Sequence, residues 1–219
     1  STPSRSTGAG GPHLDGPMSG PALGVISQAI KLWLKSVCSQ LEQLDLRLQG
    51  SLWRLLQGHL AGATVRAQGV VFQDLAIEQV ELSSEPIDLD VSALLKGQPL
   101  QLRQSFTVEG WVQLSESGLT RCIQSPALAP FKAELSHVLL DGQPLERFKI
   151  QTDGVLLHRR GAAPVPCHCL LEGGQLILRQ QQKELVVPMD PAITLEGLEL
   201  QSGQLQLRGR SLVSPEATS

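Results

Sequence analysis

The chain is poor in aromatic and charged side chains. Phe, Trp and Tyr make up 3% of its 219 residues, Tyr is missing altogether, and Asp, Glu, Lys and Arg together reach only 18%. The formal net charge is −3. Proteins that bind nucleic acids usually carry a basic excess and aromatic side chains that stack on bases. We therefore expect no nucleic-acid partner.

Long apolar runs are missing too. No segment reaches the roughly 18 consecutive apolar residues that a transmembrane helix needs, and the first 20 residues lack the apolar stretch of a signal peptide. The four Cys, at positions 38, 122, 167 and 169, form no disulfide framework. The compartment is not fixed by these features, and they favour a cytoplasmic or peripheral membrane location.

The chain is rich in aliphatic residues instead, and hydrophobic residues make up 41% of it. Its length suits one domain. Residues 1–21 are dominated by Gly, Pro, Ser and Thr, which predicts a disordered tail. We expect a single domain over residues 22–212 and a frayed C-terminal tail over 213–219.

The first ordered element is predicted to be a long amphipathic helix over residues 23–41. Its apolar residues recur at steps of three and four, while Lys31 and Lys35 lie on the opposite face. The period then changes to two at Leu44, Leu46 and Leu48, which is typical of a strand.

The rest of the chain predicts strands joined by short turns. Ser51 and Ser115 each stand where a serine would cap a helix. We expect a single helical turn at residues 92–96 and a second full helix at 127–140. A change of parity between Ile77 and Val80 suggests a β-bulge. Further strands are predicted at residues 146–151, 154–160, 167–172, 175–181, 184–188, 192–200 and 203–209. The fold class is α+β, with a meandering antiparallel sheet and the helices on one face.

Catalytic and metal-binding patterns are weak. There is no G-x-S-x-G motif, and none of the five His has a carboxylate at a recognisable spacing. Cys167 and Cys169 would share one face of a strand and His168 the other, which suits core packing better than a zinc site. We expect no enzyme activity, no cofactor and no metal.

Three blocks of the sequence resemble the LmeA-like phospholipid-binding domain family, most closely its cyanobacterial branch, long labelled a domain of unknown function. The blocks are residues 55–90, 94–128 and 193–210, and the similarity extends over about 23–210. Phe72 and Asp74 depart from the family's Y-x-G-L turn, and residues 118–121 replace a more polar stretch. The matching positions of the second block are Gly97, Pro99, Leu100, Leu102, Ser115, Glu116, Leu119, Ser125, Pro126 and Leu128.

The resemblance implies a tubular lipid-binding type of fold, a long curved sheet wrapped around the N-terminal helix. It also implies binding of phospholipid or glycolipid at a membrane surface, or lipid transfer. One alternative is a scaffold or assembly factor that binds a protein partner, and another is a lipid-ester hydrolase. In the lipid-binding hypothesis the apolar lining is Leu34, Val37, Leu52, Leu55, Leu56, Phe106 and Trp111, and the headgroup contacts are Lys31, Lys35 and Arg54.

Overall fold

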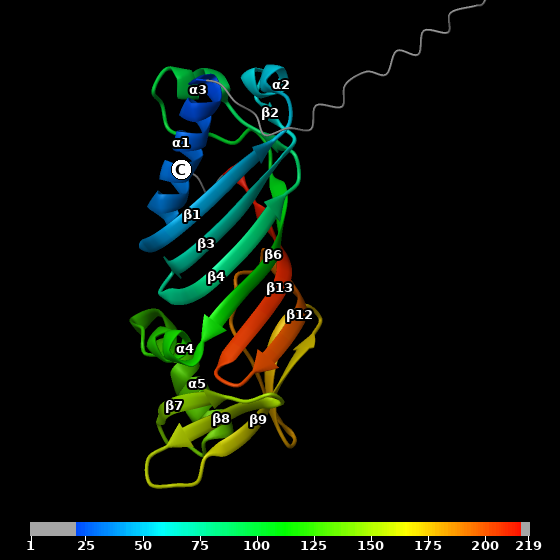
Figure 1. Ribbon diagram of the computed structural model, residues 1–219. Helices are drawn as coiled ribbons and strands as arrows, with labels where there is room; N and C mark the ends of the chain where they lie inside the picture. The colour runs from blue at the N-terminus through cyan, green and yellow to red at the C-terminus, as the bar shows by residue number, and fades with distance from the viewer. Residues whose placement is uncertain (1–20, 216–219) are drawn as a thin grey trace, which may run out of the picture.

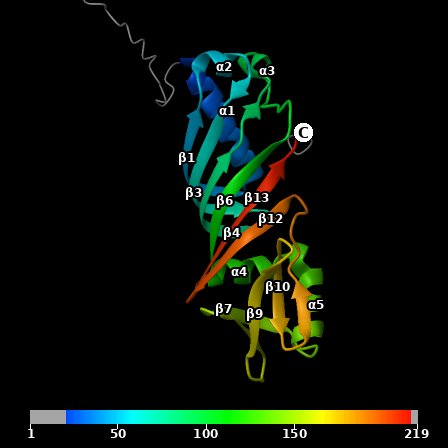
Figure 2. The ribbon, with the colours of Figure 1, turned by 90° about the vertical axis from the view of Figure 1, so that its right-hand side faces the viewer.

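The computed structural model describes residues 21–215 of the chain. The molecule is elongated, and one long sheet runs through its middle (Figure 1). A group of short helices and the N-terminal helix lie at one end of this sheet, and a second sheet with two helices lies at the other end (Figures 1 and 2). None of the described helices is long and apolar enough to cross a membrane.

The long sheet has six antiparallel strands in the order β1-β3-β4-β6-β13-β12. Side chains alternate between its two faces. We call the face that carries Leu44, Ala67 and Leu207 the core face, because these residues pack into the hydrophobic interior. The strands are β1 (Gln40–Gln49), β3 (Gly62–Phe72), β4 (Leu75–Ser84), β6 (Phe106–Ser115), β12 (Ile193–Gln201) and β13 (Gln204–Val213).

The upper end in Figure 1 is built around the N-terminal helix α1 (Pro21–Val37). Ile26 and Ile30 of this helix are buried in a cluster that we call the upper core. The cluster also includes residues of the sheet and of four short elements. These are α2 (Leu52–Leu56), β2 (His59–Leu60), β5 (Ile87–Asp88) and α3 (Val91–Leu95).

The lower end holds a five-stranded antiparallel meander in the order β11-β10-β9-β8-β7. A second cluster, the lower core, joins this meander, its helices and the long sheet. Its members include the fully buried Leu139 and Leu140. The elements are α4 (Glu116–Ile123), the 3₁₀ helix η1 (Pro126–Leu128), α5 (Ala129–Leu139), β7 (Leu145–Ile150), β8 (Gly154–Arg159), β9 (Val165–Glu172), β10 (Gln175–Gln180) and β11 (Lys183–Val186).

Two paired glycines mark the middle of the long sheet. Gly110 of β6 pairs with Gly209 of β13. A Cβ atom on Gly110 would lie 1.9 Å from the carbonyl oxygen of Glu81, and one on Gly209 would lie 2.4 Å from that of Thr194. Neighbouring strands therefore approach these positions so closely that only glycine fits there.

The turn between β3 and β4 has a backbone that usually favours glycine. Gln73 and Asp74 have φ angles of +48° and +65°. Asp74 stands where the family pattern has Gly, and Asp is one of the few residues that tolerate this left-handed conformation. The departure from the family motif therefore keeps the two-residue turn between Phe72 and Leu75, which pair with each other.

Most predicted elements are present, but several boundaries were wrong. The long helix ends at Val37 rather than 41, because the Ser39 backbone N–H bonds to the Val71 carbonyl at 2.8 Å and the chain then enters β1. Strand β13 continues to Val213, which pairs with Phe106, so the predicted tail 213–219 begins too early. The predictions for residues 1–20 and 216–219 lie outside the described residues.

The predicted bulge between Ile77 and Val80 is wrong. Strand β4 pairs with β3 in one continuous register. Ile77 and Val80 nevertheless both pack in the lower core, together with Ile123 of α4. Gly69 of the paired strand β3 has a φ angle of +60° at this level, so the backbone of β3 is irregular beside the change of parity.

The expected antiparallel α+β class is confirmed, with a different layout. The strands form two open sheets and a small two-stranded one, and the expected wrapping of one long sheet around the N-terminal helix is not confirmed. Helix α1 lies against β1 at one end of the long sheet. The sequence could not show this division, because the strands of both sheets have the same alternating pattern.

Candidate lipid-binding site

The core face of the long sheet has an aliphatic strip between its two cores. Val65 pairs with Leu82, and Leu82 pairs with Gly110, so these residues form one row across the strands together with Gly209. Val65 and Leu82 are half-buried and belong to neither core cluster. The two glycines add no side chain to the row. We call Val65, Leu82, Gly110 and Gly209 the central strip.

Four of the seven predicted lining residues meet in the upper core. Leu55 and Phe106 are buried there, and Leu34 and Leu52 pack against the cluster as half-buried side chains. Helix α1, helix α2 and strand β6 bring these residues together, although 72 positions separate Leu34 from Phe106 in the sequence. In the described structure they fill the space between α1 and the sheet.

The other three predicted lining residues lie elsewhere. Val37 and Leu56 are exposed. Trp111 lies on the face of the sheet opposite the core face, because its neighbour Val112 packs on the lower core and successive strand residues point to opposite sides. Trp111 therefore does not line the space beneath α1.

The three predicted headgroup contacts are also separated. Lys31 is half-buried and Lys35 is exposed on α1, whereas Arg54 is exposed on α2. Arg54 lies between two exposed apolar residues of the same short helix, Trp53 and Leu56. It is therefore the predicted cation that has apolar, solvent-facing neighbours on both sides.

The upper end of the molecule carries an exposed apolar surface. Trp53 is 73% exposed, Leu95 58% and Leu56 41%, and they lie on α2 and α3 at this end (Figures 1 and 2). Folding alone does not explain a Trp that remains so exposed, because a large aromatic side chain gains most by burial. We call Trp53, Leu56 and Leu95 the apical patch. The exposed Lys96 follows Leu95 directly, so the patch has a cation on each helix.

Local sequence explains why the apical helices form. The Ser51 side chain accepts a hydrogen bond from the Arg54 backbone N–H at 3.3 Å, which caps α2 as predicted. Asp90 caps α3 by accepting from the Ala93 backbone N–H at 3.1 Å and from the Ser92 hydroxyl at 2.8 Å. These two hydrogen bonds hold the pKa of Asp90 below its usual value, and the bond from the Ala93 backbone has the larger effect. Each cap starts a helix that is too short to be stable alone.

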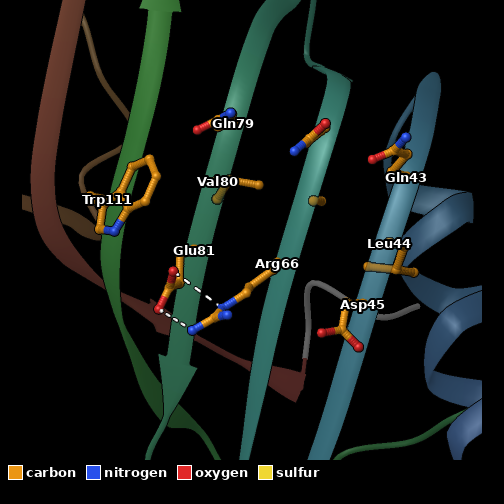
Figure 3. Close-up of a pocket in the computed structure, with 10 residues that line it drawn as sticks. Gln43, Leu44, Asp45, Arg66, Gln79, Val80, Glu81 and Trp111 are labelled. Atoms are coloured by element: carbon orange, nitrogen blue, oxygen red, sulfur yellow. Dashed lines mark hydrogen bonds and ion pairs between the residues drawn. The ribbon is translucent and has the colours of Figure 1, made fainter.

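A polar hollow of about 420 Å³ lies on the opposite face of the long sheet (Figure 3). Trp111 stands at one side of the hollow. The Arg66–Glu81 ion pair also lines the hollow, with an Nε–Oε2 distance of 3.3 Å. The remaining lining residues are Gln43, Leu44, Asp45, Ala67, Gln68, Gln79 and Val80.

One His–carboxylate pair was missed by the sequence reasoning. Nδ1 of His59 lies 2.6 Å from Oδ1 of Asp88, across the β2–β5 pair. The two residues are 29 positions apart, and the two-residue strands that bring them together leave no periodic signal. Within residues 21–215 neither His59 nor any other His has a hydrogen bond to a Ser or Cys side chain.

The cysteines of strand β9 behave as core residues. Cys167 is buried, Cys169 is half-buried and both pack in the lower core, while His168 is exposed on the other face. Burial raises the pKa of the Cys167 thiol to about 11. Burial raises the pKa of the Cys169 thiol to about 12, and the charge of Cys167 is the second cause. Residues 21–215 contain no group of three His, Cys, Asp or Glu side chains placed to hold a metal ion.

Comparison with known proteins identifies the family. The family model described as LmeA-like phospholipid-binding matches residues 18–214, which is most of the chain. No curated protein and no solved structure matches the sequence. The match includes both cores, the central strip and the apical patch. The chain thus belongs to the LmeA-like phospholipid-binding family.

Proposed function

We propose that this protein is a non-catalytic phospholipid-binding domain that acts at a membrane surface through its apical patch. The exposed Trp53 carries the proposal, because it lies with Leu56 and Leu95 at the upper end of the molecule. An aromatic ring with a polar N–H suits the boundary between headgroups and acyl chains. Arg54 and Lys96 lie beside the patch, where they would meet anionic phosphates.

The central strip is our candidate for the acyl-chain contact. Val65 and Leu82 are half-buried aliphatic side chains outside both cores, and Gly110 and Gly209 follow them in the row without side chains. Leu46 and Leu195 end the row and belong to the upper and lower core. An acyl chain that covered this row would gain about 0.8 kcal/mol for each buried CH₂ group. The half-buried Trp33 and Leu34 of α1 pack on the upper core, and we propose that they form the wall at that end of the strip.

The first experiment tests docking. Binding to vesicles of phosphatidylcholine and phosphatidylglycerol is measured by co-sedimentation for the wild type, Trp53→Ala and the control Trp111→Ala. Trp53→Ala should weaken binding about tenfold, because it removes roughly 1.5 kcal/mol of apolar burial. Trp111→Ala should bind like the wild type. Equal binding by all three proteins would exclude docking through the apical patch.

The second experiment tests lipid retention. Native mass spectrometry is applied to wild-type protein incubated with these vesicles, to Leu82→Asn in the central strip and to the exposed control Leu212→Asn. The wild type and the control should carry phospholipid, and Leu82→Asn should lose it while still sedimenting with vesicles. A wild type that neither carries phospholipid nor sediments with vesicles would refute the proposed function and favour the scaffold alternative.

A further inference from the structure

Five glutamines form a row across the face of the long sheet that carries the polar hollow. Gln43 pairs with Gln68, Gln68 with Gln79, Gln79 with Gln113 and Gln113 with Gln206. They come from five neighbouring strands, β1, β3, β4, β6 and β13. Adjacent strands lie about 4.8 Å apart, so the row is about 19 Å long. We call it the glutamine ladder.

The ladder points away from the core face. Each glutamine is next in sequence to a residue that packs in the lower core, for example Leu44, Ala67 and Leu207. Gln43, Gln68 and Gln79 are exposed and line the hollow, while Gln113 and Gln206 are half-buried. Within residues 21–215 no side-chain hydrogen bond engages any of the five amides. Both donor and acceptor groups are therefore free to meet a ligand.

A second row runs beside the ladder on the same face. It consists of Asp45, Arg66, Glu81, Trp111 and Arg208, again in pairing register. The row carries two acidic and two basic residues, so their charges cancel. The Arg66 and Glu81 side chains also pair with each other, and Asp45 Oδ2 lies 3.4 Å from Arg47 Nε. The charge balance disfavours a phosphate or nucleic-acid ligand and suits a neutral one.

We propose that this face binds a neutral saccharide chain, with Trp111 as a stacking platform and the glutamine ladder as the hydrogen-bonding row. Carboxamides offer a donor and an acceptor side by side, which matches the adjacent hydroxyls of a pyranose ring. The C–H face of such a ring packs on an aromatic side chain. The regular strand spacing suits a repeating ligand better than a compact one, because each sugar can meet its own glutamine.

The proposal is independent of phospholipid binding, because the central strip lies on the other face of the sheet and the apical patch at its upper end. The occupant we propose is a soluble saccharide chain. A lipid-linked saccharide has the same pyranose chemistry, and vesicles containing a neutral glycolipid distinguish it from the soluble chain in a second arm.

The test titrates the full chain with cellohexaose, maltohexaose, α-1,6-mannohexaose and the corresponding monosaccharides, up to about 5 mM, by isothermal calorimetry. At least one hexasaccharide should bind, and its monosaccharide should bind much more weakly. Trp111→Ala should weaken binding about fivefold or more, whereas Trp53→Ala should leave it unchanged. The glycolipid vesicles are tested with the same variants by co-sedimentation against vesicles of phosphatidylcholine alone.

A glutamine variant guards against misfolding of Trp111→Ala. Gln79→Met removes an exposed amide and preserves the side-chain length, and the matched control Gln175→Met changes an exposed glutamine of the other sheet. Gln79→Met should weaken hexasaccharide binding, and Gln175→Met should not. Absence of binding of every hexasaccharide, or binding that neither Trp111→Ala nor Gln79→Met weakens, would overturn the proposal.

Discussion

The carboxylate of Glu116 accepts a hydrogen bond from the backbone N–H of Ile150 at 2.7 Å. Glu116 directly follows β6 of the long sheet, and Ile150 ends β7 of the five-stranded sheet. The Ile150 carbonyl in turn accepts from the Gly203 N–H at 3.1 Å, at the start of β13. A single side chain thus helps to join the two sheets, at a point where Ile150 is only 1% exposed.

Replacing Glu116 by Ala should lower the free energy of unfolding by about 1.5–3 kcal/mol, because the buried Ile150 N–H loses a charged acceptor. Urea unfolding followed by circular dichroism measures this change. Glu116→Gln keeps an acceptor oxygen and should cost less. Equal stability of the Ala and Gln variants would show that the hydrogen bond contributes little.

Replacing Gly110 by Ala should destabilise the protein by about 2 kcal/mol or more, because its Cβ would lie 1.9 Å from the Glu81 carbonyl and the strands would have to separate. Gly24→Ala serves as the opposite control. It lies in α1 with no atom within 4 Å of the added Cβ, and should stabilise the helix by about 0.5–1 kcal/mol. Thermal or urea unfolding of both variants shows whether Gly110→Ala lowers the free energy of unfolding and Gly24→Ala raises it.

Truncating one large residue in each core should reveal two separate packing units. Leu55→Ala in the upper core and Leu139→Ala in the lower core should each cost about 2–5 kcal/mol. The residues share no cluster, so the costs should add in the double variant to within about 0.5 kcal/mol. Urea unfolding measures all three proteins, and strong non-additivity would contradict the division.

The acid dependence of stability should depend in part on Asp141. Its carboxylate lies 3.2 Å from Lys183 Nζ and 3.3 Å from Arg159 Nη1, and these partners, Lys183 first, hold the pKa of Asp141 below its ordinary value of 3.8. Because the pKa of Asp141 is lower in the folded than in the unfolded protein, the ion pairs stabilise the fold fully at pH values above the unfolded-state pKa. This stabilisation is lost as the pH falls through the folded-state pKa.

Asp141→Asn should therefore be less stable than the wild type at pH 6, and the difference should shrink as the pH falls below 3.8. Urea midpoints measured at several pH values give this comparison. Asp153→Asn, at an exposed position in the turn before β8, is the control, and its urea midpoint at pH 6 should stay close to that of the wild type. A difference for Asp141→Asn that does not change with pH would rule out the ion-pair explanation.

Cys167 and Cys169 should resist alkylation in the folded protein. Their pKa values are raised to about 11 and about 12, mainly by burial, so very little thiolate is present near pH 8. Iodoacetamide labelling followed by peptide mass spectrometry should show slow modification of both residues without denaturant and rapid modification in urea. Equal rates under the two conditions would mean that strand β9 opens readily.

The local elements could be predicted from the sequence because short-range signals determine them. Ser51 and Ser115 cap the helices expected of them, and the alternation of Leu205 and Leu207 marks β13. The end of α1 was placed too late because Cys38 and Leu41 continue the helical spacing. What ends the helix is the pairing of Ser39 with Val71, a contact across 32 residues.

The arrangement of these elements could not be predicted in the same way. The alternation of Phe106, Val108, Val112 and Leu114 already puts these residues on one face of β6 and Trp111 on the other, so including Trp111 in the apolar lining went against the pattern of its own strand. The glutamine ladder depends on the register of five strands, which no local pattern of one strand contains. The exposure of Trp53 agrees with helical spacing, because Trp53 is one position from Leu52 and two from the buried Leu55, and residues at these separations do not face each other.

The two cores have no residue in common, and both include residues of the same four strands of the long sheet, β1, β3, β6 and β13. A change in the twist of that sheet would therefore tilt one end of the molecule relative to the other without unpacking either core. The central strip lies between the two cores, so such a change would alter the shape of the surface that we propose for the acyl chain. The cost of that change would be spread over the many hydrogen bonds between the strands.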